Sequence, residues 1–209
     1  MQQIMPGVSA FTGLLMGRVY ALESVDGLTL IDAGIGPAAG KILKQLQEHG
    51  YSPSGVKRIL ITHAHPDHVG GLAHLQAATG AQVRAHEQEH PVLKDLLSSA
   101  HAVPQLSELR AGEVLPDVLG GMQVIFTPGH TRGHVCFWQL EQRLLFCGDV
   151  MLHLWGLGLP LPFVTVDMAE NKRSVTKLAE LDARLVCFGH GQPLVHDAVS
   201  QLRAFAAKL

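Results

Sequence analysis

The sequence predicts an α/β fold in which two β-sheets carry helices on their outer faces. Three observations point to this class. The chain begins with paired strands, it then alternates strands with helices, and after Met122 it is again rich in strands. No linker or internal repeat divides the 209 residues, and this length suits one domain with a large core. We therefore expect a single domain over residues 1–209.

The first region is expected to be antiparallel. Residues 19–23 and 28–32 are short apolar runs typical of strands. A turn at Asp26-Gly27 joins them, because Asp-Gly is a favoured hairpin pair.

Helices and strands alternate after this hairpin. Pro37 begins a helix that presents Ile42, Leu43 and Leu46 on one face, and Gly50 ends it. The other expected elements are strands over residues 58–62, 82–85, 123–126, 135–139, 143–147 and 185–188, and helices over 69–79, 87–97, 169–181 and 196–207.

Composition and charge argue against several classes of protein. The 16 Lys and Arg against 18 Asp and Glu provide no positive field for nucleic acid. No run reaches the roughly 18 apolar residues of a membrane-spanning helix, and the N-terminus lacks a signal-peptide pattern. The cysteines, Cys136, Cys147 and Cys187, lie in apolar runs, which favours reduced thiols in a cytoplasmic protein. The hydrophobic content of 47% leaves enough apolar surface for a homodimer interface or an apolar binding pocket.

Histidine is the unusual residue, with 13 in the chain. The run His63-Ala64-His65-Pro66-Asp67-His68 follows a predicted strand and places four metal-capable side chains within six positions. Imidazole suits zinc, and a nearby carboxylate suits a second ion or proton transfer. A helix N-terminus capped by Asp67 is the alternative, but it does not account for three histidines. The run therefore predicts a metal site.

Three further polar residues end predicted strands: His130, Asp149 and His190. Loops at one edge of the sheets could bring them to the same point as the histidine run. Taken alone, His130 would be a turn residue and Asp149 a helix cap. A buried carboxylate needs partners, however, so metal bridging is the sharper interpretation of Asp149.

This order of residues resembles the metallo-β-lactamase superfamily from about Leu28 to Gly191. The resemblance implies a four-layer αββα sandwich of two mixed sheets with the site at one edge. It also implies two divalent metal ions, Zn²⁺ or alternatively Fe or Mn. One ion would be held by His63, His65 and His130, a second by Asp67, His68 and His190, with Asp149 bridging both.

Two residues are expected to support the ligands. Asp32 matches an aspartate behind the metal site of this family, where a carboxylate orients a ligating histidine and raises its basicity. An ordinary turn aspartate before Gly34 is the alternative. His134 is expected to have a supporting role and is not counted as a ligand.

Two cations imply hydrolysis by a bridging hydroxide, with Asp67 and Asp149 as the catalytic carboxylates. The lack of basic surface favours a small ester, thioester or lactone. The Thr-His-x-His-x-Asp-His form starting at Thr62 resembles the glyoxalase II branch most. That branch usually adds a basic helical region for glutathione, and the sequence ends soon after His190, so glutathione thioesters are disfavoured. A phosphodiesterase, a β-lactam hydrolase, a mononuclear iron sulfur-dioxygenase and a non-catalytic metal-binding module remain alternatives.

Residues 151–163 are too apolar for an ordinary exposed loop. Their glycines and prolines argue against one continuous helix. We expect a lid or pocket wall that selects an apolar acyl group, with a dimer contact or plain core as the alternative. His153 is a candidate donor to a substrate oxygen.

Overall fold

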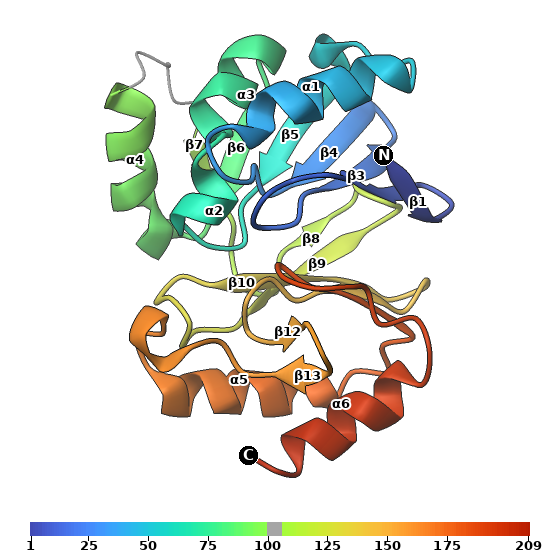
Figure 1. Cartoon of the computed structure of the whole chain (residues 1–209), viewed down its shortest axis with the longest axis vertical. Helices are drawn as coiled ribbons and strands as arrows, with labels where there is room; N and C mark the ends of the chain where they lie inside the picture. Colours follow the sequence, from blue (N-terminus) through green and yellow to red (C-terminus); the bar gives the residue numbers. More distant parts are fainter. Residues whose placement is uncertain (100–105) are drawn as a thin grey trace. The chain divides into compact units, whose positions relative to one another are not determined.

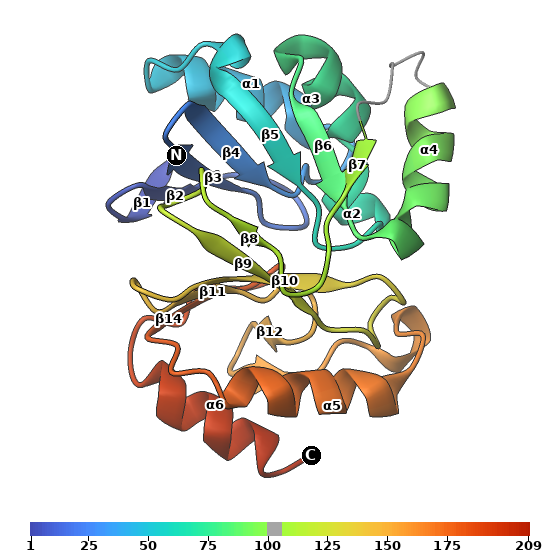
Figure 2. The same cartoon turned by 180° about the vertical axis from the view of Figure 1, so that it is seen from behind.

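The computed structural model describes residues 1–99 and 106–209. Contacts divide the chain into two compact units, Met1–Leu109 with Pro116–Gly120 and Arg110–Leu115 with Gly121–Leu209. Each unit is built on one large β-sheet that has helices packed against it (Figures 1 and 2). The predicted class, mixed sheets flanked by helices, is confirmed.

The first unit holds a mixed sheet in the order β1-β2-β3-β4-β5-β6-β7. Its strands are β1 (Gln2–Met5), β2 (Val8–Ala10), β3 (Tyr20–Ser24), β4 (Gly27–Ile31), β5 (Val56–Leu60), β6 (Gln82–Ala85) and β7 (Leu106–Glu108). Strands β3 and β4 pair antiparallel, as expected. Strands β1 to β3 also pair antiparallel, and β4 to β7 pair parallel. Parallel neighbours need crossover connections. Helix α1 (Ala38–Glu48) supplies one, and α2 (Pro66–Val69) with α3 (Leu72–Thr79) supplies the next.

The helices of this unit bury one apolar face each. Ile42 and Leu46 of α1 are four residues apart and therefore share a face. They belong to one core cluster with Leu30 of β4 and Ile59 of β5, and all four are fully buried. Helix α3 adds Leu72 and Leu75 to the same cluster, and α4 (His90–Ser99) adds Leu93 and Leu97. Figure 1 shows α1 and α3 on the same face of the sheet.

The second unit holds a sheet in the order β14-β11-β10-β9-β8. Its strands are β8 (Val114–Leu115), β9 (Met122–Phe126), β10 (Val135–Gln139), β11 (Leu144–Phe146) and β14 (Leu185–Cys187). Only the β11–β14 pair is parallel among them. Val175 of α5 (Met168–Ala179) and Leu202 of α6 (Ala198–Ala206) pack in one core with Trp138. A small hairpin, β12 (Leu152–His153) and β13 (Leu157–Gly158), lies in the apolar segment 151–163.

The predicted helix over residues 69–79 is wrong at its first turn, because two helices meet there. Gly70 and Gly71 separate α2 from α3. A Cβ on Gly70 would lie 2.6 Å from the Gly36 nitrogen, and one on Gly71 would lie 2.5 Å from the Ala33 carbonyl oxygen. The two glycines therefore let the loop after β4 touch the helical backbone.

Other boundaries also differ. The first hairpin turns at Val25-Asp26, one residue before the predicted turn, because Ser24 pairs with Gly27. The helix predicted over residues 87–97 begins with a 3-10 turn, Glu87–Glu89, before α4. Strands β1, β2, β7, β8, β12 and β13 were not expected, since runs of two to four residues are too short to show a period of two.

None of the helices described here combines the length and the apolar character that a membrane crossing requires.

Candidate metal centre

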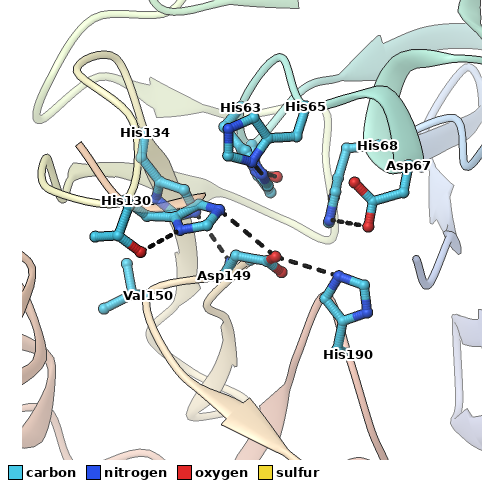
Figure 3. Close-up of polar contacts among 12 residues, drawn as sticks. His63, His65, Asp67, His68, His130, His134, Asp149, Val150 and His190 are labelled. Atoms are coloured by element: carbon cyan, nitrogen blue, oxygen red, sulfur yellow. Dashed lines mark hydrogen bonds and ion pairs between the residues drawn. The ribbon is translucent and has the colours of Figure 1, made fainter. Parts of the chain in front are cut away.

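The first ligand cluster follows β5. The chain leaves the strand with His63 fully buried, turns at Pro66 and enters α2 with Asp67 and His68. His63 Nε2 lies 3.1 Å from His65 Nδ1, and His68 Nε2 lies 3.8 Å from Asp67 Oδ2 (Figure 3). The rings of His63 and His68 have centroids 4.2 Å apart. Thus the four metal-capable side chains of this short run do gather.

Asp32 lies behind this cluster, buried at the end of β4. Its Oδ2 accepts a hydrogen bond from His68 Nδ1 at 2.7 Å and another from Thr62 Oγ1 at 2.8 Å. Because the Thr62 hydroxyl donates to the carboxylate, its oxygen must accept from His63 Nδ1 at 3.0 Å. Both histidines therefore carry their proton on Nδ1, and the lone pair of each ring lies on Nε2. This is the tautomer that suits a metal ligand held by an outer partner.

Glu89 is a supporting residue that the sequence patterns did not reveal. Its carboxylate is buried, and Oε2 accepts a hydrogen bond from the Ala64 backbone N–H at 2.8 Å. Ala64 separates His63 from His65, so Glu89 fixes the backbone between two candidate ligands. The signal available in the sequence was an acidic residue at the start of a predicted helix, which is ordinary for a helix terminus.

The second cluster lies at strand ends of the second unit. His130 follows β9, Asp149 follows β11 and His190 follows β14. Asp149 Oδ2 lies 3.6 Å from His130 Nε2 and 3.2 Å from His190 Nε2, as the dashed lines in Figure 3 mark. The Asp149 carboxylate therefore lies beside a ring nitrogen of each histidine.

The tautomer of His130 is set in the same way as that of His63. Thr165 Oγ1 donates a hydrogen bond to the Leu161 carbonyl oxygen at 3.0 Å. The hydroxyl oxygen can then accept from His130 Nδ1, which lies 3.3 Å away. The lone pair of His130 is thus on Nε2, the nitrogen nearest Asp149. Thr165 is a second supporting residue that only the structure reveals.

His134 has a different arrangement. Its Nε2 accepts a hydrogen bond from the Asp149 backbone N–H at 3.1 Å. Its Nδ1 must then be protonated, and this N–H donates to Thr127 Oγ1 at 2.9 Å. Because protein groups engage both ring nitrogens, His134 orients the backbone of Asp149 and has no nitrogen to offer a metal ion.

The donor sets of both clusters fit divalent metal ions. Nitrogen and oxygen atoms that bind tetrahedral Zn²⁺ at about 2.0–2.1 Å stand about 3.3 Å from one another. The contacts within the two clusters are 3.1, 3.2, 3.6 and 3.8 Å long. Imidazole with carboxylate is also the mixed donor set that zinc, iron and manganese accept.

The predicted metal ligands all belong to one of the two clusters, and the predicted supporting residues, Asp32 and His134, contact them. Asp32, His63, His65, Asp67 and His68 belong to the first unit, and His130, His134, Asp149 and His190 belong to the second. His153, predicted as a substrate donor, uses its Nδ1 to contact the Gln192 carbonyl oxygen at 2.8 Å.

The cysteines take no part in these clusters. All three are buried and lie outside any disulfide. Burial raises the pKa of Cys136 to about 12 and that of Cys147 well above its usual value. Neutral thiols of this kind are core residues and are unsuited to nucleophilic or metal chemistry.

Comparison with known proteins finds one family and several relatives. A family model described as the metallo-beta-lactamase superfamily matches residues 12–190. A hydroxyacylglutathione hydrolase of Cereibacter sphaeroides is 35% identical over 76% of this chain, and the match spans 59% of that relative's length. A probable metallo-hydrolase of Bacillus subtilis, YflN, is 26% identical over 90% of this chain and 85% of its own.

Solved structures share the fold. A metallo-beta-lactamase family protein of Thermus thermophilus superposes with a TM-score of 0.79 at 26% identity, covering 99% of this chain and 80% of that one. An archaeal superfamily protein of Sulfolobus tokodaii gives a TM-score of 0.74 at 22% identity, covering 97% and 85%.

Proposed function

Because the chain belongs to the metallo-β-lactamase superfamily, we propose that it is a dinuclear metal-dependent hydrolase of a small ester, thioester or lactone. The proposal treats residues 1–209 as one domain of this family, which the match over residues 12–190 supports, since that range includes parts of both units. The cytoplasmic location and the homodimer expected from the sequence stay predictions.

One observation carries the proposal. His63, His68 and His130 each direct Nδ1 at a protein oxygen that fixes the tautomer, so each ring has its lone pair on Nε2. His134 also directs Nδ1 at a protein oxygen, but its Nε2 accepts from a backbone N–H. In His63, His68 and His130 the lone pair on Nε2 instead lies beside a second metal-capable donor, as it must in a ligand to a shared ion. The family's ligand order then assigns the ions: one to His63, His65 and His130, the other to Asp67, His68 and His190, with Asp149 shared.

The chain's own residues would perform the following tasks. Asp149 Oδ2 lies near His130 and His190, where its negative charge would offset that of the bound metal ions. His134 holds the Asp149 backbone. Asp67 is only partly buried, so its carboxylate can orient a water molecule and take up its proton. Two divalent ions, when bound, lower the pKa of water from 15.7 towards about 7 and polarise a carbonyl oxygen.

The relatives support carbonyl chemistry. The substrate named in the Cereibacter protein is a hydroxyacylglutathione, which is a thioester. The chain spans 59% of the length of that relative, so the glutathione part of the substrate is not carried over. We therefore include thioesters, and rank esters and lactones beside them. The formal net charge of −2 still disfavours phosphodiesters of nucleic acids.

A substrate panel tests the reaction class. The protein, depleted with a chelator and reloaded with Zn²⁺, would be assayed on S-lactoylglutathione, a lactone, an aryl ester, a β-lactam and a phosphodiester. We expect hydrolysis of the thioester, the lactone or the aryl ester that is lost on chelation and lost in Asp149→Ala. His196→Ala, at an exposed histidine, should behave as wild type.

Other outcomes point to the alternatives. Faster turnover of the β-lactam or the phosphodiester than of the thioester, the lactone and the aryl ester would overturn the proposed substrate class. One iron per chain with oxygen consumption on persulfides would identify a sulfur-dioxygenase. Full metal loading with no turnover on the panel would favour a non-catalytic metal-binding module.

A further inference from the structure

The β12–β13 hairpin is joined to the loop that carries His190. The His153 backbone N–H donates to the His190 carbonyl oxygen at 3.1 Å. The Gln192 backbone N–H donates to the His153 carbonyl oxygen at 3.0 Å. One residue of the hairpin therefore holds the loop on both sides of Gly191.

The side chain of His153 adds a third bond to the same loop. Its Nδ1 lies 2.8 Å from the Gln192 carbonyl oxygen, and because a carbonyl only accepts, Nδ1 donates. The ring also contacts Phe188, with centroids 5.4 Å apart, and Phe188 is fully buried. His153 thus touches residues just before and just after His190.

Gly191 allows the hairpin to approach this closely. Its φ is +96°, and a Cβ at this position would lie 1.9 Å from the His153 carbonyl oxygen. No side chain fits there. The two backbones are therefore in direct contact, and the loop cannot shift without moving His153.

The opposite side of the loop is also held. The Gly189 N–H donates to the Gly148 carbonyl oxygen at 2.8 Å, next to Asp149. His190 lies between this bond and those from His153. Its Nε2 is 3.2 Å from Asp149 Oδ2, so the position of the ring depends on both supports.

We propose that His153 is a positioning residue that fixes the loop of His190 so that Nε2 points at Asp149. This inference rests on the proposed function, in which His190 is a metal ligand. It gives the start of the apolar segment 151–163 a task different from the expected lid. It also explains why the Nδ1 proton of His153 faces Gln192 and not a substrate.

Cobalt binding tests the inference without any substrate. Metal-depleted protein would be titrated with Co²⁺ alone, and the visible absorption band and the stoichiometry would be recorded for wild type, His153→Leu and His153→Asn. Asparagine places an amide N–H where the ring has Nδ1, whereas leucine has no donor. His196→Leu, an exposed histidine of the same unit, is the matched control.

We expect His153→Leu to bind the more weakly held Co²⁺ ion about 3–10-fold less tightly and with an altered band, because one side-chain hydrogen bond to the loop is lost while the backbone bonds stay. His153→Asn should stay within about threefold of wild type, because the hydrogen bond is kept. The pair His153→Ala and His153→Asn repeats the comparison if the leucine variant does not fold.

His153→Leu, or His153→Ala in its place, with the affinity and band of wild type would overturn the inference. Co²⁺ binding by His153→Asn as weak as that of His153→Leu would also overturn it, since the hydrogen bond would then not be the cause. His190→Ala separates this result from a failure of the proposed function. If His190→Ala binds as much Co²⁺ as wild type, the ligand assignment is wrong and the inference falls with it.

Discussion

The carboxylate of Asp32 accepts a hydrogen bond of 2.7 Å from Nδ1 of His68, and both side chains are buried. The same carboxylate binds Thr62, whose hydroxyl in turn orients His63. One residue therefore sets the direction of two candidate ligands. Asp32 also has a positive φ of 62°, a conformation that Asp and Asn tolerate better than most residues.

The first prediction concerns the charge of Asp32. Asp32→Asn keeps the size of the side chain and its tolerance of positive φ but removes the charge that favours His68 as a donor. We expect metal affinity to fall about 10–100-fold, measured by competition with a coloured chelator. Asp26→Asn, at an exposed aspartate of the first hairpin, should leave the affinity unchanged. Equal losses in the two variants would show that the effect is not specific to the cluster.

The second prediction concerns Glu89. Glu89→Ala removes the acceptor of the buried Ala64 N–H, so the free energy of unfolding should fall by about 1–3 kcal/mol. Glu89→Gln retains an acceptor oxygen and should lose less. Urea denaturation of the three proteins gives the comparison. A glutamine variant as unstable as the alanine variant would mean that the contact with Ala64 is not what Glu89 contributes.

The third prediction concerns Gly129, which precedes His130. Its φ is +129°, and a Cβ would lie 2.2 Å from the Asn171 backbone nitrogen. Gly129→Ala should therefore cost at least about 1–3 kcal/mol from the strained backbone alone. Gly40 of α1 has open space around it, so Gly40→Ala should stabilise by about 0.5–1 kcal/mol. Thermal unfolding would distinguish the two variants. The melting temperature should fall for Gly129→Ala and rise for Gly40→Ala, and a change in the same direction for both would contradict the prediction.

The fourth prediction concerns the thiols. Because burial raises the pKa values of Cys136 and Cys147, these groups stay protonated at pH 8. A thiol-reactive disulfide reagent should modify none of the three cysteines rapidly in the folded protein and all three in guanidinium. Rapid modification of any cysteine under native conditions would show that its thiol is accessible and would contradict the prediction.

Several parts of the molecule could be predicted from sequence because their signals are local. His63 to His68 lie within six positions, and Asp32, Asp149 and His190 each end an apolar run. Strands β6 and β10 were predicted with their observed bounds, since β6 alternates polar and apolar residues and β10 has four apolar residues in a row.

The remainder depends on contacts that the local pattern does not contain. Glu89 meets Ala64 across 25 positions, and Thr165 meets His130 across 35. The break at Gly70-Gly71 arises because the loop after β4 approaches the helix there. The expected lid at residues 151–163 contains a hairpin that binds the His190 loop, while Trp155 at its tip is 99% exposed. The role of that exposed tip stays a prediction.

The metal content of the purified chain tests the central claim most directly. Elemental analysis after gel filtration should give close to two divalent ions per chain for wild type and no more than one for Asp149→Ala, with His134→Ala in between. A wild-type content below one ion, or two ions retained by Asp149→Ala, would contradict the shared dinuclear centre.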